Sequence, residues 1–85
     1  MVIEMLYFAW VREAIGVGSE QVDPPATIIT LKDLIGWLAG RSEGHARAFA
    51  DKSRVRAAVD QRFVPLDSPI AGAREIALFP PVTGG

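Results

Sequence analysis

Segments that alternate in polarity, or that are rich in β-branched and aromatic residues, predict four or five short β-strands. Successive side chains of a strand face opposite sides, so one face of each strand is buried and the other is open. Glu4 marks the open face of the first segment and Glu75 that of the last, which places Phe8 and Phe79 on the open side. The segments are residues 2–10, 19–23, 54–60, 62–66 and 74–79.

The middle of the chain carries a helical spacing of apolar residues instead. An amphipathic helix is predicted over residues 30–40, because apolar residues recur there at i, i+3, i+4 and i+7. Thr30 is expected as its N-cap, with Asp33 in a variant of the capping box, and Gly40 as its stop. The apolar stripe consists of Leu31, Leu34, Ile35 and Leu38.

Two shorter helices are predicted on either side, over residues 11–18 and 43–51. Two strands, a helix and two or three further strands are typical of a small α+β fold, with the helix packed on one face of a sheet. A chain of 85 residues forms one domain. We assign residues 1–79 to this domain and residues 80–85 to an extended C-terminal tail.

The composition indicates a globular protein that binds neither nucleic acid nor a membrane. The chain is 49% hydrophobic and 22% charged, with a formal net charge of −1. Lys and Arg form no run that could follow a phosphate backbone, and no apolar stretch approaches the ~20 residues of a membrane span. The first ten residues lack the basic start of a secretory signal peptide and include Glu4. We therefore expect a cytoplasmic location.

The chain contains no cysteine and a single histidine, His45. The absence of cysteine excludes disulfides, thiolate metal sites and a cysteine nucleophile. One histidine cannot build a metal site alone, so we expect His45 to lie on the surface. Candidate chemistry therefore has to come from another part of the sequence.

The last seven residues read Phe-Pro-Pro-Val-Thr-Gly-Gly. Two glycines close a chain by chance in about one case in two hundred, so this ending suggests a function. Pro80 and Pro81 fix φ near −65° and disfavour a helix. Residues 80–85 can span roughly 20 Å when extended. The tail is therefore expected to leave the last strand extended and stiff.

This tail delivers one reactive group. Gly84 and Gly85 have no Cβ, so behind Val82 and Thr83 they can pass through a narrow channel. The terminal carboxylate of Gly85 is an anion at neutral pH, with a pKa of about 3.5. Positioned against a phosphorus atom of ATP on another protein, it can form an acyl-adenylate. A branched last residue would crowd that carbonyl group.

Three segments carry a resemblance to a known family: LYFAWVRE near the start, AAVDQRFVPLDSPI before the last strand, and the ending FPPVTGG. They closely resemble the small, sulfur-carrying subunits of molybdopterin synthase, in the MoaD/ThiS group. The resemblance spans nearly the whole chain, and the ending is its most specific part. It implies a β-grasp, ubiquitin-like fold: a mixed sheet of four to five strands, with the first and last strands parallel neighbours and a helix on one face.

The resemblance also implies the chemistry and the partners. An adenylyltransferase related to ubiquitin-activating enzymes adenylates Gly85 with Mg-ATP, and a sulfurtransferase relay converts it to a thiocarboxylate. The tail inserts into the large synthase subunit, where the sulfur attacks cyclic pyranopterin monophosphate, and two transfers give the dithiolene of molybdopterin. The enzyme would hold two copies of each subunit. Its acid and base groups would lie on the large subunit, and this chain would hold no metal or permanent cofactor.

An aromatic partner surface is expected on the open side of the sheet. Phe8, Phe63 and Phe79 are predicted to lie there, with Arg12 as a polar contact at the rim. The resemblance places a hydrophobic contact to both the large subunit and the activating enzyme at this surface. The alternative is that some of these rings belong to the core.

The sequence departs from the family's pattern at two turns. Asp60 stands where the family usually has Asn. Ala73, Arg74 and Glu75 replace a Gly-Asp-Glu turn, and the glycine has moved to Gly72. These departures leave the local turn geometry open, and they do not touch the tail.

Three other functions fit parts of the sequence. A thiamine-pathway sulfur carrier shares the family, although its chains are usually shorter. A ubiquitin-like modifier would join its Gly-Gly ending to lysines of target proteins and produce a ladder of isopeptide conjugates. A non-catalytic binding module with a frayed tail would be unaffected by removal of Gly84 and Gly85.

Overall fold

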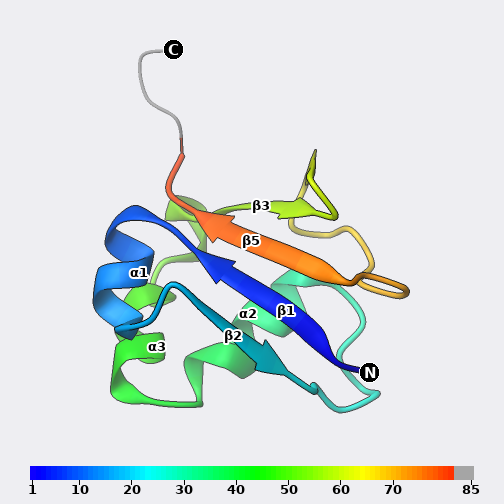
Figure 1. The fold of residues 1–85 in the computed structure, drawn as a ribbon, viewed down its shortest axis with the longest axis horizontal. Helices are drawn as coiled ribbons and strands as arrows, with labels where there is room; N and C mark the ends of the chain where they lie inside the picture. Colours follow the sequence, from blue (N-terminus) through cyan, green and yellow to red (C-terminus); the bar gives the residue numbers. More distant parts are fainter. Residues whose placement is uncertain (82–85) are drawn as a thin grey trace.

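Five strands pair into one mixed sheet, in the order β2-β1-β5-β3-β4, in the computed structural model, which describes residues 1–81 (Figure 1). The strands are β1 (Ile3–Tyr7), β2 (Ser19–Val22), β3 (Arg56–Val59), β4 (Arg62–Val64) and β5 (Glu75–Phe79). The other elements are α1 (Ala9–Ile15), α2 (Leu31–Ala39), α3 (Glu43–Ala48) and the short 3-10 turn η1 (Lys52–Arg54).

The first and last strands are parallel neighbours at the centre of the sheet, as the β-grasp prediction required. Met5 lies beside Ile76 and Tyr7 beside Leu78 in this register. The other three pairings are antiparallel, and β2 forms one edge, as predicted for its polar segment. The predicted α+β fold with a mixed sheet is therefore confirmed.

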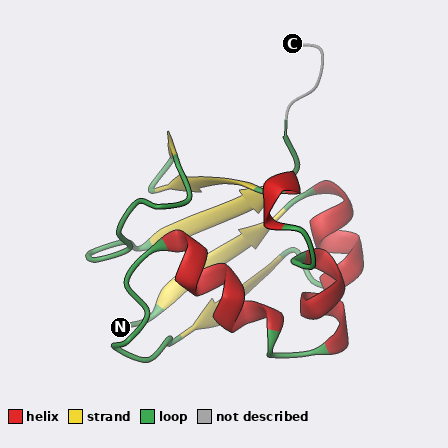
Figure 2. Ribbon diagram, turned by 180° about the vertical axis from the view of Figure 1, so that it is seen from behind, coloured by secondary structure: helices red, strands yellow, loops and turns green. Residues whose placement is uncertain are grey.

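The helices cover one face of the sheet and leave the other face uncovered (Figures 1 and 2). Side chains of β1 and β5 that point to the helices are fully or almost fully buried, whereas their alternate neighbours are partly exposed. Burial of this apolar surface is the main force that holds the layers together. Large, fully buried side chains of this core include Ile3, Met5, Tyr7, Leu31, Leu34, Ile35, Leu38, Ile76 and Leu78.

Helix α2 follows its sequence signals closely. The backbone N–H of Asp33 donates to Thr30 Oγ1, and the N–H of Thr30 donates to Asp33 Oδ2, both at 3.1 Å. These reciprocal bonds form the predicted capping box and satisfy two N–H groups at the helix start. Gly40 is the C-cap, as expected. None of the helices within residues 1–81 is long and apolar enough to cross a bilayer.

The last three residues of the first predicted strand, residues 8–10, are not part of a strand. The strand over residues 2–10 ends at Tyr7, and α1 begins at Ala9, whose φ of 54° turns the chain sharply. Val11 is fully buried on this helix. The short helix predicted over residues 11–18 is therefore confirmed: it begins two residues earlier, at Ala9, and has Gly16 as its C-cap. Residues 8–10 have a strand-like composition but lead into this helix, because strand propensity depends strongly on context.

Helices α1 and α3 pack closely at Gly44. A Cβ at this position would lie 2.4 Å from the carbonyl oxygen of Ala14, which is backbone and cannot move aside cheaply. Glycine is therefore required for this helix contact. The contact ties α3 to the helix that follows β1.

The two turns that depart from the family's pattern are joined to each other. Asp60 has a φ of 49°, a conformation that Asn and Asp adopt more readily than most residues. Its Oδ1 accepts the backbone N–H groups of Arg74 at 3.1 Å and Glu75 at 2.9 Å. Gly72, with a φ of 78°, supplies the left-handed position of the second turn. The carboxylate of Asp60 thus ties the β3–β4 turn to the start of β5.

Leu38→Ala tests the packing of α2 on the sheet. Leu38 is 0% exposed, so truncation should leave a cavity and lower the free energy of unfolding by about 2–5 kcal/mol. Denaturant unfolding of this variant and of Lys32→Ala, which changes an exposed position on the same helix, measures the difference. An unchanged midpoint for Leu38→Ala would mean that the helix presents a different face to the sheet.

Candidate functional site at the root of the tail

The tail leaves the sheet at the edge where β1 and β5 both end (Figure 1). The backbone N–H of Phe8 donates to the carbonyl of Leu78 at 3.2 Å, so the two strand ends are held together. Pro80 and Pro81 follow as half-buried residues. The remaining tail positions named by the sequence, Val82, Thr83, Gly84 and Gly85, lie outside the described residues.

Phe63 and Phe79 form an aromatic pair beside this edge. Their ring centroids are 5.6 Å apart with an interplanar angle of 54°, within the range favoured by aromatic pairs. Phe63 is 82% exposed although it is a large apolar residue, and Phe79 is half-buried. The helix-free face of the sheet therefore offers an aromatic surface, as the alternation in the sequence predicted.

An open hollow of about 340 Å³ lies at this pair. Its mostly apolar wall comes from the last three strands of the chain, β3, β4 and β5, which lie side by side in the sheet. A side chain from another protein could be held here against the two rings. The hollow is lined by Arg56, Ala57, Phe63, Val64, Pro65 and Phe79.

Phe8 and Arg12 lie on the neighbouring element. Phe8 is 49% exposed and is the N-cap of α1, so its predicted place on the strand itself is corrected. Arg12 is exposed on α1, and its Nε lies close to Gly18, where an added Cβ would approach it to 3.2 Å. Neither residue is part of the hollow's wall, and Arg12 lies toward the start of β2, on the other side of β1 from the hollow.

The sequence reasoning missed two arginines at this edge. The Arg54 guanidinium lies over the Trp10 ring at 5.2 Å from its centroid. Arg56 pairs in register with Phe79 and lines the hollow. Trp10 could have been assigned to α1 by extending the helix predicted over residues 11–18 toward its N-terminus. The pairing of Trp10 with Arg54 had no local signal, because only the tertiary fold brings them together.

Comparison with known proteins decides the family. Residues 5–85 match the ThiS family. The chain belongs to the ThiS family. The molybdopterin synthase sulfur carrier subunit of Escherichia coli strain K12 is 40% identical to it over 83 residues, which cover 98% of this chain and 99% of that protein. The subunit of the same name from Haemophilus influenzae is 38% identical over 84 residues, with the same coverage.

A solved structure shares the fold of this ThiS-family chain. Small archaeal modifier protein 1 of Haloferax volcanii superimposes with a TM-score of 0.74 at 27% identity, over 95% of this chain and 98% of that one. This likeness agrees with the ubiquitin-like β-grasp fold. The family match includes residues 82–85, which are the part of the tail that the structure does not describe.

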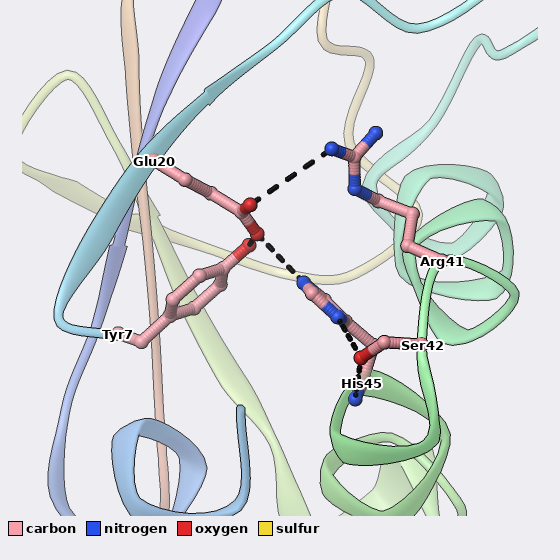
Figure 3. A network of polar contacts seen from close by, with 5 residues as sticks. All are labelled: Tyr7, Glu20, Arg41, Ser42 and His45. Carbon is pink, nitrogen blue, oxygen red and sulfur yellow. Dashed lines mark hydrogen bonds and ion pairs between the residues drawn. The ribbon is translucent and has the colours of Figure 1, made fainter. Parts of the chain in front are cut away.

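A second polar site in this ThiS-family chain surrounds His45 (Figure 3). Its Nε2 lies 2.6 Å from Glu20 Oε2, and its Nδ1 lies 2.7 Å from Ser42 Oγ. Tyr7 donates its hydroxyl to the same Glu20 oxygen at 2.7 Å, and Arg41 stands 3.9 Å from the other. His45 is only 7% exposed, so its predicted surface position is wrong. Burial is tolerated because both ring nitrogens have partners.

This network is a structural clamp. Ser42, His45 and Glu20 include the residue types of a hydrolase triad, but here Nε2 faces the carboxylate, whereas hydrolases use Nδ1 for that contact. Ser42 is also occupied as the N-cap of α3, where its Oγ accepts the His45 backbone N–H at 3.1 Å. The bonds therefore fix α3 to the edge strand β2 and activate no nucleophile.

The clamp also affects two pKa values. Partial burial alone would raise the pKa of Glu20, but hydrogen bonds from His45 and Tyr7, together with the charges of His45 and Arg41, outweigh it and hold this pKa below its ordinary value. Burial, followed by the bond to Glu20, raises the pKa of Tyr7 above its ordinary value. The clamp thus favours an ionised Glu20 and a neutral Tyr7.

Glu20→Gln should reduce the loss of stability in acid. Because the pKa of Glu20 is lower in the folded than in the unfolded chain, its contribution is fully present above about pH 4.3 and is lost as the pH falls through the folded value. Denaturant unfolding between about pH 6 and pH 3 should therefore show a steeper decline for the wild type than for the variant. Asp33 and Asp51, whose pKa values are also lowered, are common to both proteins and cancel. Parallel curves would contradict this role of the clamp.

Proposed function

We propose that this chain is the sulfur-carrying subunit of a molybdopterin synthase, and that the carboxylate of Gly85 carries the sulfur. The observation that carries this proposal is the similarity, over almost the full length of both chains, to two subunits that bear this name. The exit of Pro80 and Pro81 beside an exposed aromatic surface supports it, because a tail that enters a partner needs a docking surface at its root.

The first step activates the tail. The Gly85 carboxylate attacks the α-phosphorus of Mg-ATP on an adenylyltransferase, and an acyl–phosphate bond forms as pyrophosphate leaves. A sulfur nucleophile from a sulfurtransferase relay then attacks the acyl carbon and displaces AMP. The nucleophile is a persulfide of the relay, so this attack gives an acyl disulfide. A thiol of the relay then attacks the relay-side sulfur of this disulfide, the S–S bond breaks, a relay disulfide forms, and the thiocarboxylate remains on Gly85. The chain itself needs no cysteine for these steps, and it has none.

The second step transfers the sulfur. The thiocarboxylate enters the large subunit and its sulfur attacks cyclic pyranopterin monophosphate; water then cleaves the acyl–sulfur bond and returns Gly85 to a carboxylate. Two such transfers from two loaded chains give the dithiolene. In this reaction the small subunit acts as the sulfur donor of a sulfurtransferase, and the large subunit supplies the acid and base groups. We further propose that this reaction takes place in the cytoplasm.

The folded domain serves the tail in two ways. Pro80 and Pro81 limit the conformations of the exit, so less chain entropy is lost when the tail is bound. Phe63 and Phe79 dock the domain so that the tail points into the partner, and Phe8 and Arg12, before and on α1, add further contacts. Val82, Thr83 and Gly84 then thread the channel, where small or extended residues fit best.

A second candidate is a protein modifier whose Gly85 forms amide bonds with lysines of target proteins. The likeness to small archaeal modifier protein 1 favours it, because that protein shares the fold over nearly its whole length. Both functions use the same acyl-adenylate and differ in the nucleophile that follows. Conjugates of higher mass that resist thiol reagents would distinguish the modifier from the carrier.

Deleting Gly85 should abolish adenylation and leave the fold unchanged. The reacting carboxylate is displaced by one residue, whereas the core of β1, β5 and α2 is untouched. Pyrophosphate exchange with the adenylyltransferase measures the first effect, and a thermal melt measures the second. Exchange at the wild-type rate with the shortened chain would contradict the proposal.

Phe79→Ala should weaken binding to the large subunit and leave thermal stability nearly unchanged. Buried aromatic anchors contribute roughly 2 kcal/mol or more to an interface, which corresponds to a loss of affinity of about thirtyfold. Ile76→Ala is the matched control, because Ile76 lies on the same strand with its side chain fully buried in the core. It should lower stability while its folded fraction binds normally. If Phe79→Ala behaves like this control, the ring belongs to the core and the docking surface is wrong.

A further inference from the structure

Two guanidinium groups flank the edge of the sheet where the tail begins. Arg56 lies beside Phe79 in the pairing of β3 with β5 and forms part of the hollow's wall. Arg54 lies two residues before Arg56, the first residue of β3. Its guanidinium lies over the ring of Trp10, at the start of α1. Both residues are exposed. We call Arg54 and Arg56 the basic rim.

The side chains of the basic rim are held in place before any partner arrives. The Nη1 of Arg56 donates to the carbonyls of Ser53 at 3.0 Å and Val55 at 3.1 Å. Arg54 stacks on the Trp10 ring at a centroid distance of 5.2 Å, a cation–π contact. An arginine normally loses side-chain conformational entropy when it is fixed at an interface. This entropic cost is smaller when the side chain is already ordered in the free protein.

The charges of the basic rim are not neutralised within residues 1–81. The ion pairs in this part of the chain join Met1 to Asp23 and Glu20 to Arg41 and His45. The Asp51 carboxylate is near enough for Arg54 to help lower its pKa, but its hydrogen bonds go to Ser53. Two ordered positive charges therefore face solvent near the root of the tail, and one of them, Arg56, lines the apolar hollow.

The opposite end of the same sheet face is acidic. Glu4 and Glu75 are direct neighbours across the parallel pairing of β1 and β5, and neither forms an ion pair within residues 1–81. The open face thus carries two neighbouring carboxylates at the strand starts, with the exposed Arg74 beside them, and the guanidinium of Arg56 at the strand ends, while the chain as a whole has a net charge of only −1. This polarity orients a partner so that its acidic region meets the tail root.

We propose that the basic rim docks against carboxylates that surround the mouth of the tail channel on the large synthase subunit. The apolar hollow at Phe63 and Phe79 forms the centre of the contact, and Arg54 and Arg56 form its charged border. Charged residues at the border of an interface mainly accelerate association and set its salt dependence. The inference rests on the proposed function, because it takes the large subunit as the partner.

The test is the association rate of the full chain with the large subunit from the same genome. Stopped-flow rates are measured at ionic strengths of about 10 mM and about 1 M, where the Debye length is about 30 Å and 3 Å. The double variant Arg54→Glu/Arg56→Glu should associate about tenfold more slowly than the wild type at low salt, and the difference should vanish at high salt. Arg54→Gln/Arg56→Gln should show a smaller loss of the same kind.

Arg74→Glu is the matched control. It changes the net charge by two units at one exposed residue, at the far end of β5 from the tail, as much as Arg54→Gln/Arg56→Gln does at the basic rim. Its association rate should stay within about twofold of the wild type at both salt concentrations. An equal loss of association rate for Arg74→Glu, or wild-type association rates for both double variants, would contradict the proposed docking role of the basic rim.

The same measurements separate this inference from the proposed function. If the wild-type chain binds the large subunit and forms a thiocarboxylate while the double variants associate normally, the basic rim is wrong and the carrier function stands. If the wild-type chain shows no binding to the large subunit, both are overturned. If a double variant fails to fold in a thermal melt, the other double variant and its salt dependence still decide the question.

Discussion

The parallel pairing of β1 with β5 fixes the position of every other feature described above. It brings the first and last strands of the chain together at the centre of the sheet, with Met5 beside Ile76 and Tyr7 beside Leu78. Because the two strands run in the same direction, the start of α1 and the root of the tail emerge at one edge. A register shift by one residue would turn the buried faces of these strands outward and separate the aromatic surface from the tail.

This arrangement separates a packed domain from the tail that leaves it at Pro80. The core, the Asp60 turn and the clamp around His45 hold strands and helices that do no chemistry themselves. The Gly44 contact ties α3 to α1, and α1 begins at the same edge as the tail. Stability of the domain therefore secures the direction in which Pro80 and Pro81 leave the sheet.

Local signals in the sequence were sufficient where neighbours in the chain decide the structure. The Thr30–Asp33 capping box and the apolar stripe of α2 follow from spacing alone, and the alternation around Glu75 placed Phe79 on the open face. Tertiary contacts decided the rest. Residues 8–10 have a strand-like composition but lead into the helix that was predicted from Val11 onward. His45 is buried because Glu20, distant in sequence, accepts its Nε2–H. Arg54 and Trp10 meet only in the folded chain.

The central claim is that Gly85 carries sulfur as a thiocarboxylate while the rest of the chain stays chemically unchanged. The most direct measurement is the intact mass of the purified chain after incubation with its adenylyltransferase, Mg-ATP, a sulfurtransferase and a sulfur source, followed by fragmentation to locate any change. The account predicts a mass increase equal to the replacement of one oxygen by sulfur, confined to the C-terminal residue. An unchanged mass under conditions in which pyrophosphate is released, or a sulfur found elsewhere in the chain, would contradict it.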